Sequence, residues 1–291
     1  MGEISFPHLG ISIENLPNGF SLFGFRIAFY GVIIAVAFVV GYYLADRMAK
    51  KTKQSSEMYL DFAMIVIVFS IIGARVYYVL FEWDYYKNNL LQIFNTRGGG
   101  LAIYGGVVAA IITSFVFAKK KKVSVGLLMD TACVGLVMGQ AIGRWGNFFN
   151  REAFGTYTDC LFAMRIPWNT AVSHMSEKSV EKLLPYMTDS MIQVHPTFLY
   201  ESIWNVVLFF VLWNYTPHKK FDGEVICLYL AGYGLGRVWI EALRTDQLLL
   251  WNTGIPISQL LAGIMVIASF WIITFQRLRL KKKRKMEQSI E

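Results

Sequence analysis

A dense polar segment, GRWGNFFNREAFG at 143–155, directly follows an apolar run that is long enough to cross a bilayer. The run is VSVGLLMDTACVGLVMGQAI at 123–142, and Arg144 and Asn147 stand at its end. Ionisable side chains in or beside a membrane span are costly unless they pair, line a cavity or serve a ligand. An arginine presents a planar fork of N–H donors that matches a phosphate. Anion binding is therefore the chemistry that this position suggests.

A second polar motif, YGLGRVWIEALR at 233–244, also lies at the end of an apolar run. Arg237, Glu241 and Arg244 are spaced i, i+4 and i+7, so a helix would place all three on one face. Glu241 is expected to pair with Arg237 and to fix its guanidinium. Two arginines from different helices, Arg144 and Arg237, could then grip one phosphodiester.

A third segment, HPTFLYES at 195–202, places His195 and Glu201 at the start of another apolar run. A lone histidine at a membrane interface can be a structural residue with satisfied hydrogen bonds. Histidine is also the side chain whose unperturbed pKa suits acid–base chemistry near neutral pH. The segment by itself leaves both roles open.

The composition assigns the chain to the membrane class. Of its 291 residues, 55% are hydrophobic and 16% are charged, and the mean hydropathy is +0.43. Soluble domains carry about 25% charged residues, so a soluble fold would leave several apolar runs unexplained. The three cysteines lack metal-type spacing and predict neither a disulfide nor a redox role. No cluster of ligands predicts a metal or a cofactor.

Seven stretches are long and apolar enough to span a bilayer as helices, which needs about 20 residues each. Their length and their lack of polar alternation exclude a membrane β-barrel. The prediction is an all-α, polytopic membrane protein with about seven transmembrane helices, in one integral-membrane domain over 1–291. The predicted spans lie near 24–45, 59–81, 99–118, 123–143, 196–215, 222–241 and 255–275.

Short clusters of Lys and Arg follow the first, third, fifth and seventh predicted spans, at 47–53, 119–122, 219–220 and 277–285. The positive-inside rule places these segments in the cytoplasm, so the N-terminus is expected outside and the C-terminus in the cytoplasm. The net charge of +8 then reflects anchors beside anionic membrane lipids, and no nucleic-acid partner is expected. The segment 144–195 is expected to form a small extracytoplasmic cap or arm within the domain.

Polar residues of several spans fall on the outer side in this topology, which predicts one shared cavity at the outer leaflet. The abundant anion with an apolar body at that leaflet is a phospholipid head group. The alternative is that each arginine extends separately to the membrane surface. The residues concerned are Arg26, Tyr30, Arg75, Tyr104, Arg144, Glu201, Arg237 and Glu241, with Asn147 and Asn150 beside them.

The motifs GRWGNFFNREAFG, HPTFLYES, GYGLGRVWIEALR and PISQLL are similar, in order and spacing, to those of the prolipoprotein diacylglyceryl transferase family. The similarity runs from FYG at 29–31 through the seventh span. The resemblance implies a seven-span enzyme of the bacterial inner membrane. Such an enzyme moves the diacylglyceryl group of phosphatidylglycerol to the lipobox cysteine thiol in a prolipoprotein signal peptide. The product is a thioether, and glycerol phosphate is released.

The resemblance also implies roles for individual residues. It assigns lipid phosphate binding to Arg144 and carries Asn147, Glu152 and Gly155 over as the signature asparagine, glutamate and glycine. Together with the residue patterns above, it gives two sets. The expected catalytic residues are Arg144, Arg237, Glu241, Tyr104 and Tyr30. The expected substrate-binding residues are Arg144, Asn147, Asn150, Glu152, Gly155, His195, Glu201 and Arg244.

One position departs from the family pattern, because this chain has Tyr104 where well-known members carry histidine before two glycines. A phenol, with an ordinary pKa near 10, is a poor base at neutral pH. A thiol with a pKa of about 8.5 is already partly ionised, and nearby arginines favour the thiolate further. We therefore expect the Tyr104 hydroxyl to orient a substrate, and the sequence does not identify the base.

Two other function classes compete with a transferase. A transporter with an outer anion site would be expected to show repeated halves and broken spans near the midplane, and neither pattern is visible. A lipid hydrolase would use water in place of the thiol, and the chain contains no GxSxG motif. Both classes rank below the transferase.

Overall fold

Seven long helices dominate the fold, as predicted, and the chain is a multi-pass membrane protein. The computed structural model describes residues 3–96, 99–250 and 253–289. Within these ranges, seven helices have the length and hydropathy of a membrane span. They are α1 (Phe29–Lys51), α2 (Ser56–Phe81), α4 (Ile103–Lys121), α5 (Val125–Asn150), α8 (Thr197–Tyr215), α9 (Glu224–Leu243) and α10 (Ile257–Gln288).

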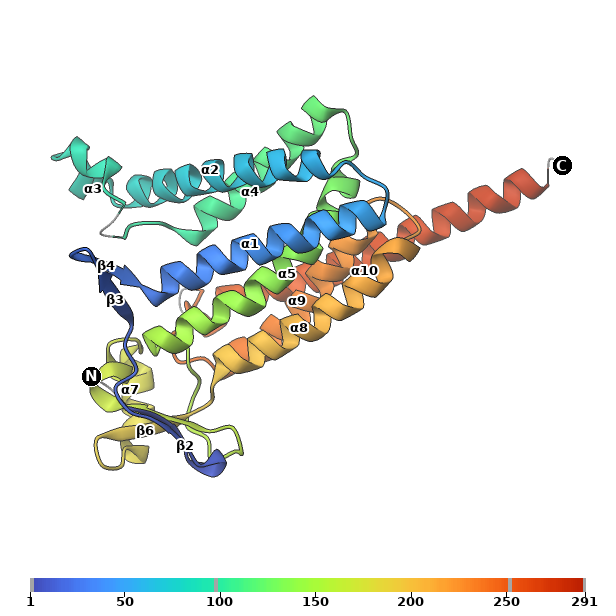
Figure 1. Cartoon of the computed structure of the whole chain (residues 1–291). Coiled ribbons are helices and arrows are strands. Elements are labelled where there is room, and N and C mark those ends of the chain that lie inside the picture. The colour runs from blue at the N-terminus through green and yellow to red at the C-terminus, as the bar shows by residue number, and fades with distance from the viewer. Residues whose placement is uncertain (1–2, 97–98, 251–252, 290–291) are drawn as a thin grey trace.

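Capping residues mark the starts of two of the membrane helices, and two helices extend beyond their predicted ends. Ser55 and Ser124 precede α2 and α5, and each side chain accepts a hydrogen bond from a first-turn backbone N–H. α5 runs to Asn150, beyond the predicted end of its span at 143, so Arg144 and Asn147 lie inside its last two turns. α10 likewise continues past 275, and its basic end projects from the bundle (Figure 1).

The helices form two groups (Figure 1). α2 and α4 make an antiparallel pair, while α1, α5, α8, α9 and α10 form the main bundle. α1 and α5 approach closely at Gly41 and Gly135, where a Cβ on Gly135 would collide with the carbonyl oxygen of Gly41. Small residues allow such contacts between membrane helices. A buried cluster that includes Met48, Val134 and Leu212 joins α1, α5 and α8.

Short strands at one end of the bundle were not predicted. β1 (Ile4–Phe6), β2 (Ile11–Ile13), β5 (Met164–Pro167) and β6 (Met191–Val194) form an antiparallel sheet in the order β2-β1-β5-β6. Ser5 pairs with Arg165, and Met164 pairs with Val194. The segment between α5 and α8 therefore shares its sheet with the N-terminal residues. Alternate side chains bury a separate apolar core that includes Ile4, Ile166 and Ile192.

The start of the first span was also predicted too early. Residues 19–28, which were partly assigned to that span, form a hairpin of β3 (Gly19–Leu22) and β4 (Phe25–Ala28). The hairpin, α3, α7 and the four-stranded sheet all lie at the same end of the bundle (Figure 1). The remaining short elements are α3 (Trp83–Tyr86), α6 (Trp168–Val172), α7 (Glu177–Leu183), η1 (Pro7–Leu9), η2 (Leu90–Phe94), η3 (Leu184–Tyr186) and η4 (Thr216–His218).

Candidate active site

Three helices bring two arginines to one carboxylate. Glu201, in the first turns of α8, places Oε2 2.5 Å from Nη2 of Arg144 on α5 and Oε1 3.0 Å from Nη1 of Arg237 on α9. Glu201 is only 5% exposed. A carboxylate buried to this extent needs paired charges, and the two guanidinium groups supply them. The sequence predicted that Arg144, Glu201 and Arg237 would share one cavity, but it did not predict that Glu201 pairs with both arginines.

The predicted ion pair on α9 is confirmed. Nη2 of Arg237 lies 2.6 Å from Oε2 of Glu241, one helical turn away. Glu241 is 3% exposed, so this pair is also withdrawn from solvent. Arg237 therefore binds Glu201 through one nitrogen and Glu241 through the other, which fixes the plane of its guanidinium.

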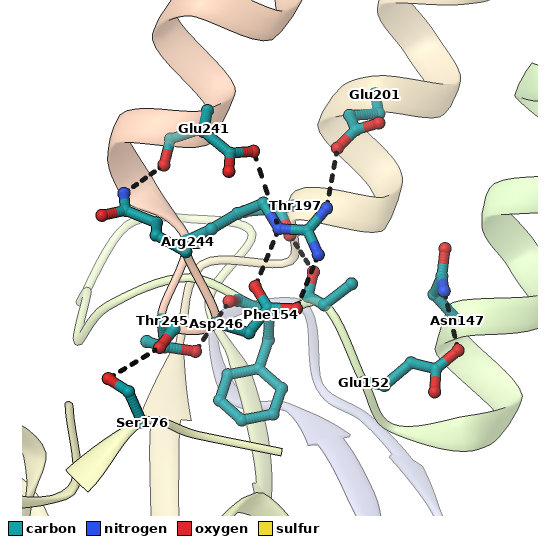
Figure 2. A network of polar contacts seen from close by, with 12 residues as sticks. Asn147, Glu152, Phe154, Ser176, Thr197, Glu201, Glu241, Arg244, Thr245 and Asp246 are labelled. Atoms are coloured by element: carbon teal, nitrogen blue, oxygen red, sulfur yellow. Dashed lines mark hydrogen bonds and ion pairs between the residues drawn. The ribbon is translucent and has the colours of Figure 1, made fainter. Parts of the chain in front are cut away.

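Arg244 adds a third cation beside these carboxylates, just after α9 ends. It binds Asp246 through Nε at 2.9 Å and Nη2 at 2.6 Å, and its Nη1 lies 3.7 Å from Glu201. Figure 2 shows the guanidinium between Glu201, Glu241 and Asp246. Burial opposes the charge of Arg244, but Asp246 and the two glutamates outweigh burial and raise its pKa above the usual value. Asp246 was not predicted, although its position two residues after Arg244 was a usable signal.

The signature segment at 143–155 adds a chain of amides to the arginine cluster. This cluster consists of Arg144, Glu201, Arg237, Glu241, Arg244 and Asp246. Nη1 of Arg144 approaches Oδ1 of Asn147 at 3.5 Å. Nδ2 of Asn147 donates to Oε1 of Glu152 at 2.8 Å, as Figure 2 shows. Asn150 donates to the same oxygen of Glu152 at 3.3 Å. α5 ends at Arg151 in the left-handed region, with φ of 56°, and this turn brings Glu152 back toward the helix. The polar residues of the motif thus contact one another.

Gly155 connects the signature to the two other motifs. Its backbone N–H donates to the carbonyl oxygen of His195 at 2.9 Å, and the next residue donates to Leu243 at 2.8 Å. A Cβ at Gly155 would lie 2.8 Å from the Cβ of His195 and 3.0 Å from the oxygen of Leu243. Glycine is needed here because two neighbouring segments both lie against the position that a Cβ would occupy.

Tyr30 lies against the same helix end. Its ring packs on Gly146, where a Cβ would lie 2.6 Å from the ring carbon Cδ2. Tyr30 is close enough to Arg144 and Glu152 for their charges to act on its hydroxyl. The structure therefore places Tyr30 beside the signature residues.

His195 faces a different group. Its Nδ1 lies 3.2 Å from the hydroxyl of Tyr200, and that hydroxyl lies 3.4 Å from Sγ of Cys160. Burial lowers the pKa of His195, which favours the neutral imidazole. Neither contact was predicted: Tyr200 lies in the same HPTFLYES segment as His195, five residues on, whereas Cys160 comes from a separate segment.

Arg26, Arg75 and Tyr104 do not join the cluster, and the predicted convergence was wrong for Arg26 and Arg75. Arg26 lies on β4 and donates to Asn18 at 2.7 Å. Arg75 donates to five backbone carbonyl groups between Gln92 and Gly100. Among the described residues, no hydrogen bond, ion pair or ring contact links Tyr104 to the arginines, and Tyr104 is 44% exposed. These residues belong to the α2–α4 pair or to the hairpin.

The arrangement can bind an anion in a low-dielectric setting. Three arginines are oriented by Glu201, Glu241 and Asp246 at the end of three membrane helices. Fixed cations of this kind stabilise charge that develops on a leaving group. In the part of the chain that the structure describes, no group of three His, Cys, Asp or Glu side chains is placed to hold a metal ion.

Comparison with known proteins identifies the family. The family model described as prolipoprotein diacylglyceryl transferase matches residues 17–275. The chain belongs to this family. The match includes all the motifs above and six of the seven membrane helices in full, and it ends within α10.

Relatives in the family are similar over most of their length. A phosphatidylglycerol–prolipoprotein diacylglyceryl transferase of Finegoldia magna is 40% identical over 250 residues, which cover 86% of this chain and 91% of the relative. One of Clostridioides difficile is 41% identical over 231 residues, which cover 79% and 84%. One of Listeria innocua is 38% identical over 283 residues, which cover 97% and 98%.

Proposed function

We propose that this protein transfers the diacylglyceryl group of phosphatidylglycerol to the lipobox cysteine thiol of a preprolipoprotein, the first step of bacterial lipoprotein maturation. Membership of the diacylglyceryl transferase family supports the assignment of this reaction to the protein. The observation that carries the assignment to this site is the contact of Arg144 and Arg237 with one carboxylate, because it shows both guanidinium groups directed at a single anion position.

The reaction is a substitution at carbon. The acceptor thiolate attacks the glycerol carbon that carries the phosphate oxygen, a C–S bond forms, and the C–O bond breaks. The electron pair leaves with glycerol phosphate. Because a phosphodiester with one negative charge becomes a monoester that carries a second, the transition state gains charge on the phosphate. Arg144 and Arg237 are the residues that we assign to that charge.

The other residues hold the arginines or lie beside them. Glu241 holds Arg237, and Asp246 holds Arg244. Asn147, Asn150 and Glu152 form the polar wall beside Arg144, where we place the lipid head group. Tyr30 packs on the same helix end and is placed to hydrogen-bond a substrate. These assignments position the lipid phosphate without a cofactor.

We place the protein in the bacterial cell membrane with the arginine cluster toward the outer leaflet. The strands, the segment 144–195 and the cluster share one end of the bundle, while the basic segments 47–53, 119–122 and 277–285 lie toward the other end (Figure 1). Basic segments beside spans favour the cytoplasmic side and its anionic lipids. The N-terminus is then outside and the C-terminus in the cytoplasm.

The test of function is direct transfer. Purified protein is incubated with phosphatidylglycerol and a synthetic lipobox peptide, and the peptide is weighed by mass spectrometry. The expected product is the peptide plus one diacylglyceryl group, and a peptide with the acceptor cysteine replaced by serine serves as the control. An unmodified cysteine peptide, with lipid consumed by hydrolysis, would contradict transferase activity.

Topology gives a second prediction. Single cysteines introduced into 156–194 in a background without native cysteines should react with a membrane-impermeant maleimide added from outside. Single cysteines at 119–122 should react only after the cytoplasmic side is opened. The reverse labelling pattern would overturn the placement of the site at the outer leaflet.

Tyr104 gives a third prediction. Tyr104→Phe is expected to slow transfer only about 2- to 13-fold, because it removes one hydrogen bond of about 0.5–1.5 kcal/mol. Tyr104→His should remain active. The measurement is the transfer rate against pH for wild type and both variants. A loss of a thousandfold in the Phe variant, with one ionisation missing from its profile, would identify Tyr104 as the base.

A further inference from the structure

Glu201 occupies the position that the proposed function gives to the lipid phosphate. Its two oxygens contact Arg144 at 2.5 Å and Arg237 at 3.0 Å. A carboxylate between two guanidinium groups presents the same two-oxygen edge as a phosphodiester. The lipid phosphate and Glu201 therefore compete for the same N–H donors.

An exchange of the two anions keeps the cluster balanced. In direct ion pairs, Arg144, Arg237 and Arg244 stand against Glu201, Glu241 and Asp246, three cations against three carboxylates. Glu152 is linked to Arg144 only through Asn147. A phosphodiester carries one negative charge, as Glu201 does. Breaking a buried ion pair is costly when it leaves a charge without a partner. Replacement of one anion by another avoids this cost for the arginines, provided that the displaced carboxylate finds new donors.

A receiving group for the displaced carboxylate lies one turn further along α8. Asn205 follows Glu201 at i+4, on the same helix face, and is only 2% exposed. Its side-chain amide makes no hydrogen bond to any residue that the structure describes. Asn205 lines the cavity that also borders Glu201, so its amide is a donor that a group entering the cavity can reach.

A small cavity beside the two residues has room for one carboxylate oxygen. Glu201, Asn205, Tyr233 and Arg237 line a small cavity between α8 and α9, together with Trp204, Gly236 and Ile240. Its volume is about 10 Å³. This volume is roughly that needed by one water-sized group, and a carboxylate oxygen is of that size.

We propose that Glu201 is an internal counter-ion that the phosphodiester of the lipid displaces from Arg144 and Arg237, and that Asn205 receives the displaced carboxylate. The inference rests on the proposed function and adds the step by which the lipid enters the site. Asn205 is a positioning residue in this account, since it acts through Glu201. Before the lipid binds, Glu201 keeps both arginines paired, and the lipid phosphate then takes over the contacts of Glu201.

The Glu201→Gln variant tests whether Glu201 competes with the lipid phosphate or only orients the two arginines. If Glu201 competes with the lipid, the uncharged amide should tighten binding of phosphatidylglycerol by about tenfold, because the lipid no longer has to displace an anion. If Glu201 only orients the arginines, the same change should weaken binding. The full-length protein in detergent is titrated with short-chain phosphatidylglycerol, without acceptor peptide. Diacylglycerol, which lacks the phosphate, is the control ligand.

Asn205→Leu provides an independent test in case the Gln variant does not fold. This change removes the receiving amide, so binding of phosphatidylglycerol should weaken by about tenfold while the melting temperature stays the same or rises, because an unpaired buried amide is removed. Asn205→Asp should weaken binding further, since it places a second negative charge in the cavity. The matched control is Asn214→Leu on the same helix, where Nδ2 of Asn214 donates to the carbonyl of Phe210. That control should bind lipid as wild type does.

The possible results are distinct. Weaker or unchanged lipid binding in Glu201→Gln, or unchanged binding in Asn205→Leu, would overturn the exchange. Because binding is measured without the acceptor peptide, a protein that binds lipid and shows both shifts but transfers nothing would contradict the transferase reaction and support the exchange.

Discussion

Replacing Arg144 or Arg237 with lysine is expected to reduce transfer by about 100- to 1000-fold, although the positive charge is kept. Loss of one donor aimed at developing charge has an effect of this order. In this structure each arginine uses separate nitrogens for separate contacts, and Arg237 spans Glu201 and Glu241. A lysine ammonium is a point charge and cannot hold both the carboxylate and the plane of a phosphate.

The measurement is the rate of diacylglyceryl transfer to the lipobox peptide, with the amount of folded protein in the membrane determined for each variant. Arg279→Lys is the control, because Arg279 lies in the exposed basic end of α10. It should transfer at the wild-type rate. Near-normal rates in both Arg144→Lys and Arg237→Lys would refute the assignment of the phosphate to these two side chains.

Gly155→Ala is expected to lower transfer by about 100-fold and to lower the melting temperature. The added methyl group would lie 2.8 Å from the Cβ of His195 and 3.0 Å from the carbonyl oxygen of Leu243. Neither atom is at the end of a flexible side chain, so the backbone must shift, at roughly 1–3 kcal/mol. The shift disturbs the isolated β-bridge between Gly155 and Arg244. Misplacement of a catalytic group by about 1 Å can reduce a rate by about 100-fold.

The matched control is Gly263→Ala on α10, where a Cβ would meet no atom within 4 Å. In a helix this change is expected to stabilise by roughly 0.5–1 kcal/mol, and transfer should be unaffected. Thermal unfolding and transfer rates are measured on both variants. A Gly155→Ala protein that melts and transfers as wild type does would show that the close approach at Gly155 has no role in the site.

Local patterns predicted the parts of this molecule that depend on neighbours in sequence. Seven apolar runs of bilayer length gave the seven helices, because each span satisfies its own backbone hydrogen bonds. The i, i+4 spacing gave the pair of Arg237 and Glu241, since helix geometry alone brings those side chains together. The motifs also pointed correctly to Arg144 and Arg237 as residues of one cluster.

Local sequence patterns did not predict the contacts between segments that are distant in sequence. The N-terminal strands are three residues long, too short to leave a clear period, and β1 needs β5 from more than 150 residues away as its partner. Arg75 resembles Arg144 in sequence as an arginine in an apolar helix. The structure gives it five backbone carbonyl partners instead of an anion site. Two residues at the same depth in the membrane can lie on different helix faces, so depth alone does not determine which residues contact each other.

The sequence by itself determined the membrane class, the seven spans and the residue types that can bind a phosphate. These follow from hydropathy, helix periodicity and the chemistry of the guanidinium group. Only the tertiary structure decided that Glu201 bridges Arg144 and Arg237 and that Asn205 lines a small cavity beside Glu201. It also decided that, within the described part of the chain, no hydrogen bond or ring contact links Tyr104 to these arginines. The physical reason is that the distances between helices depend on how closely their surfaces pack, and no spacing within one helix specifies that packing.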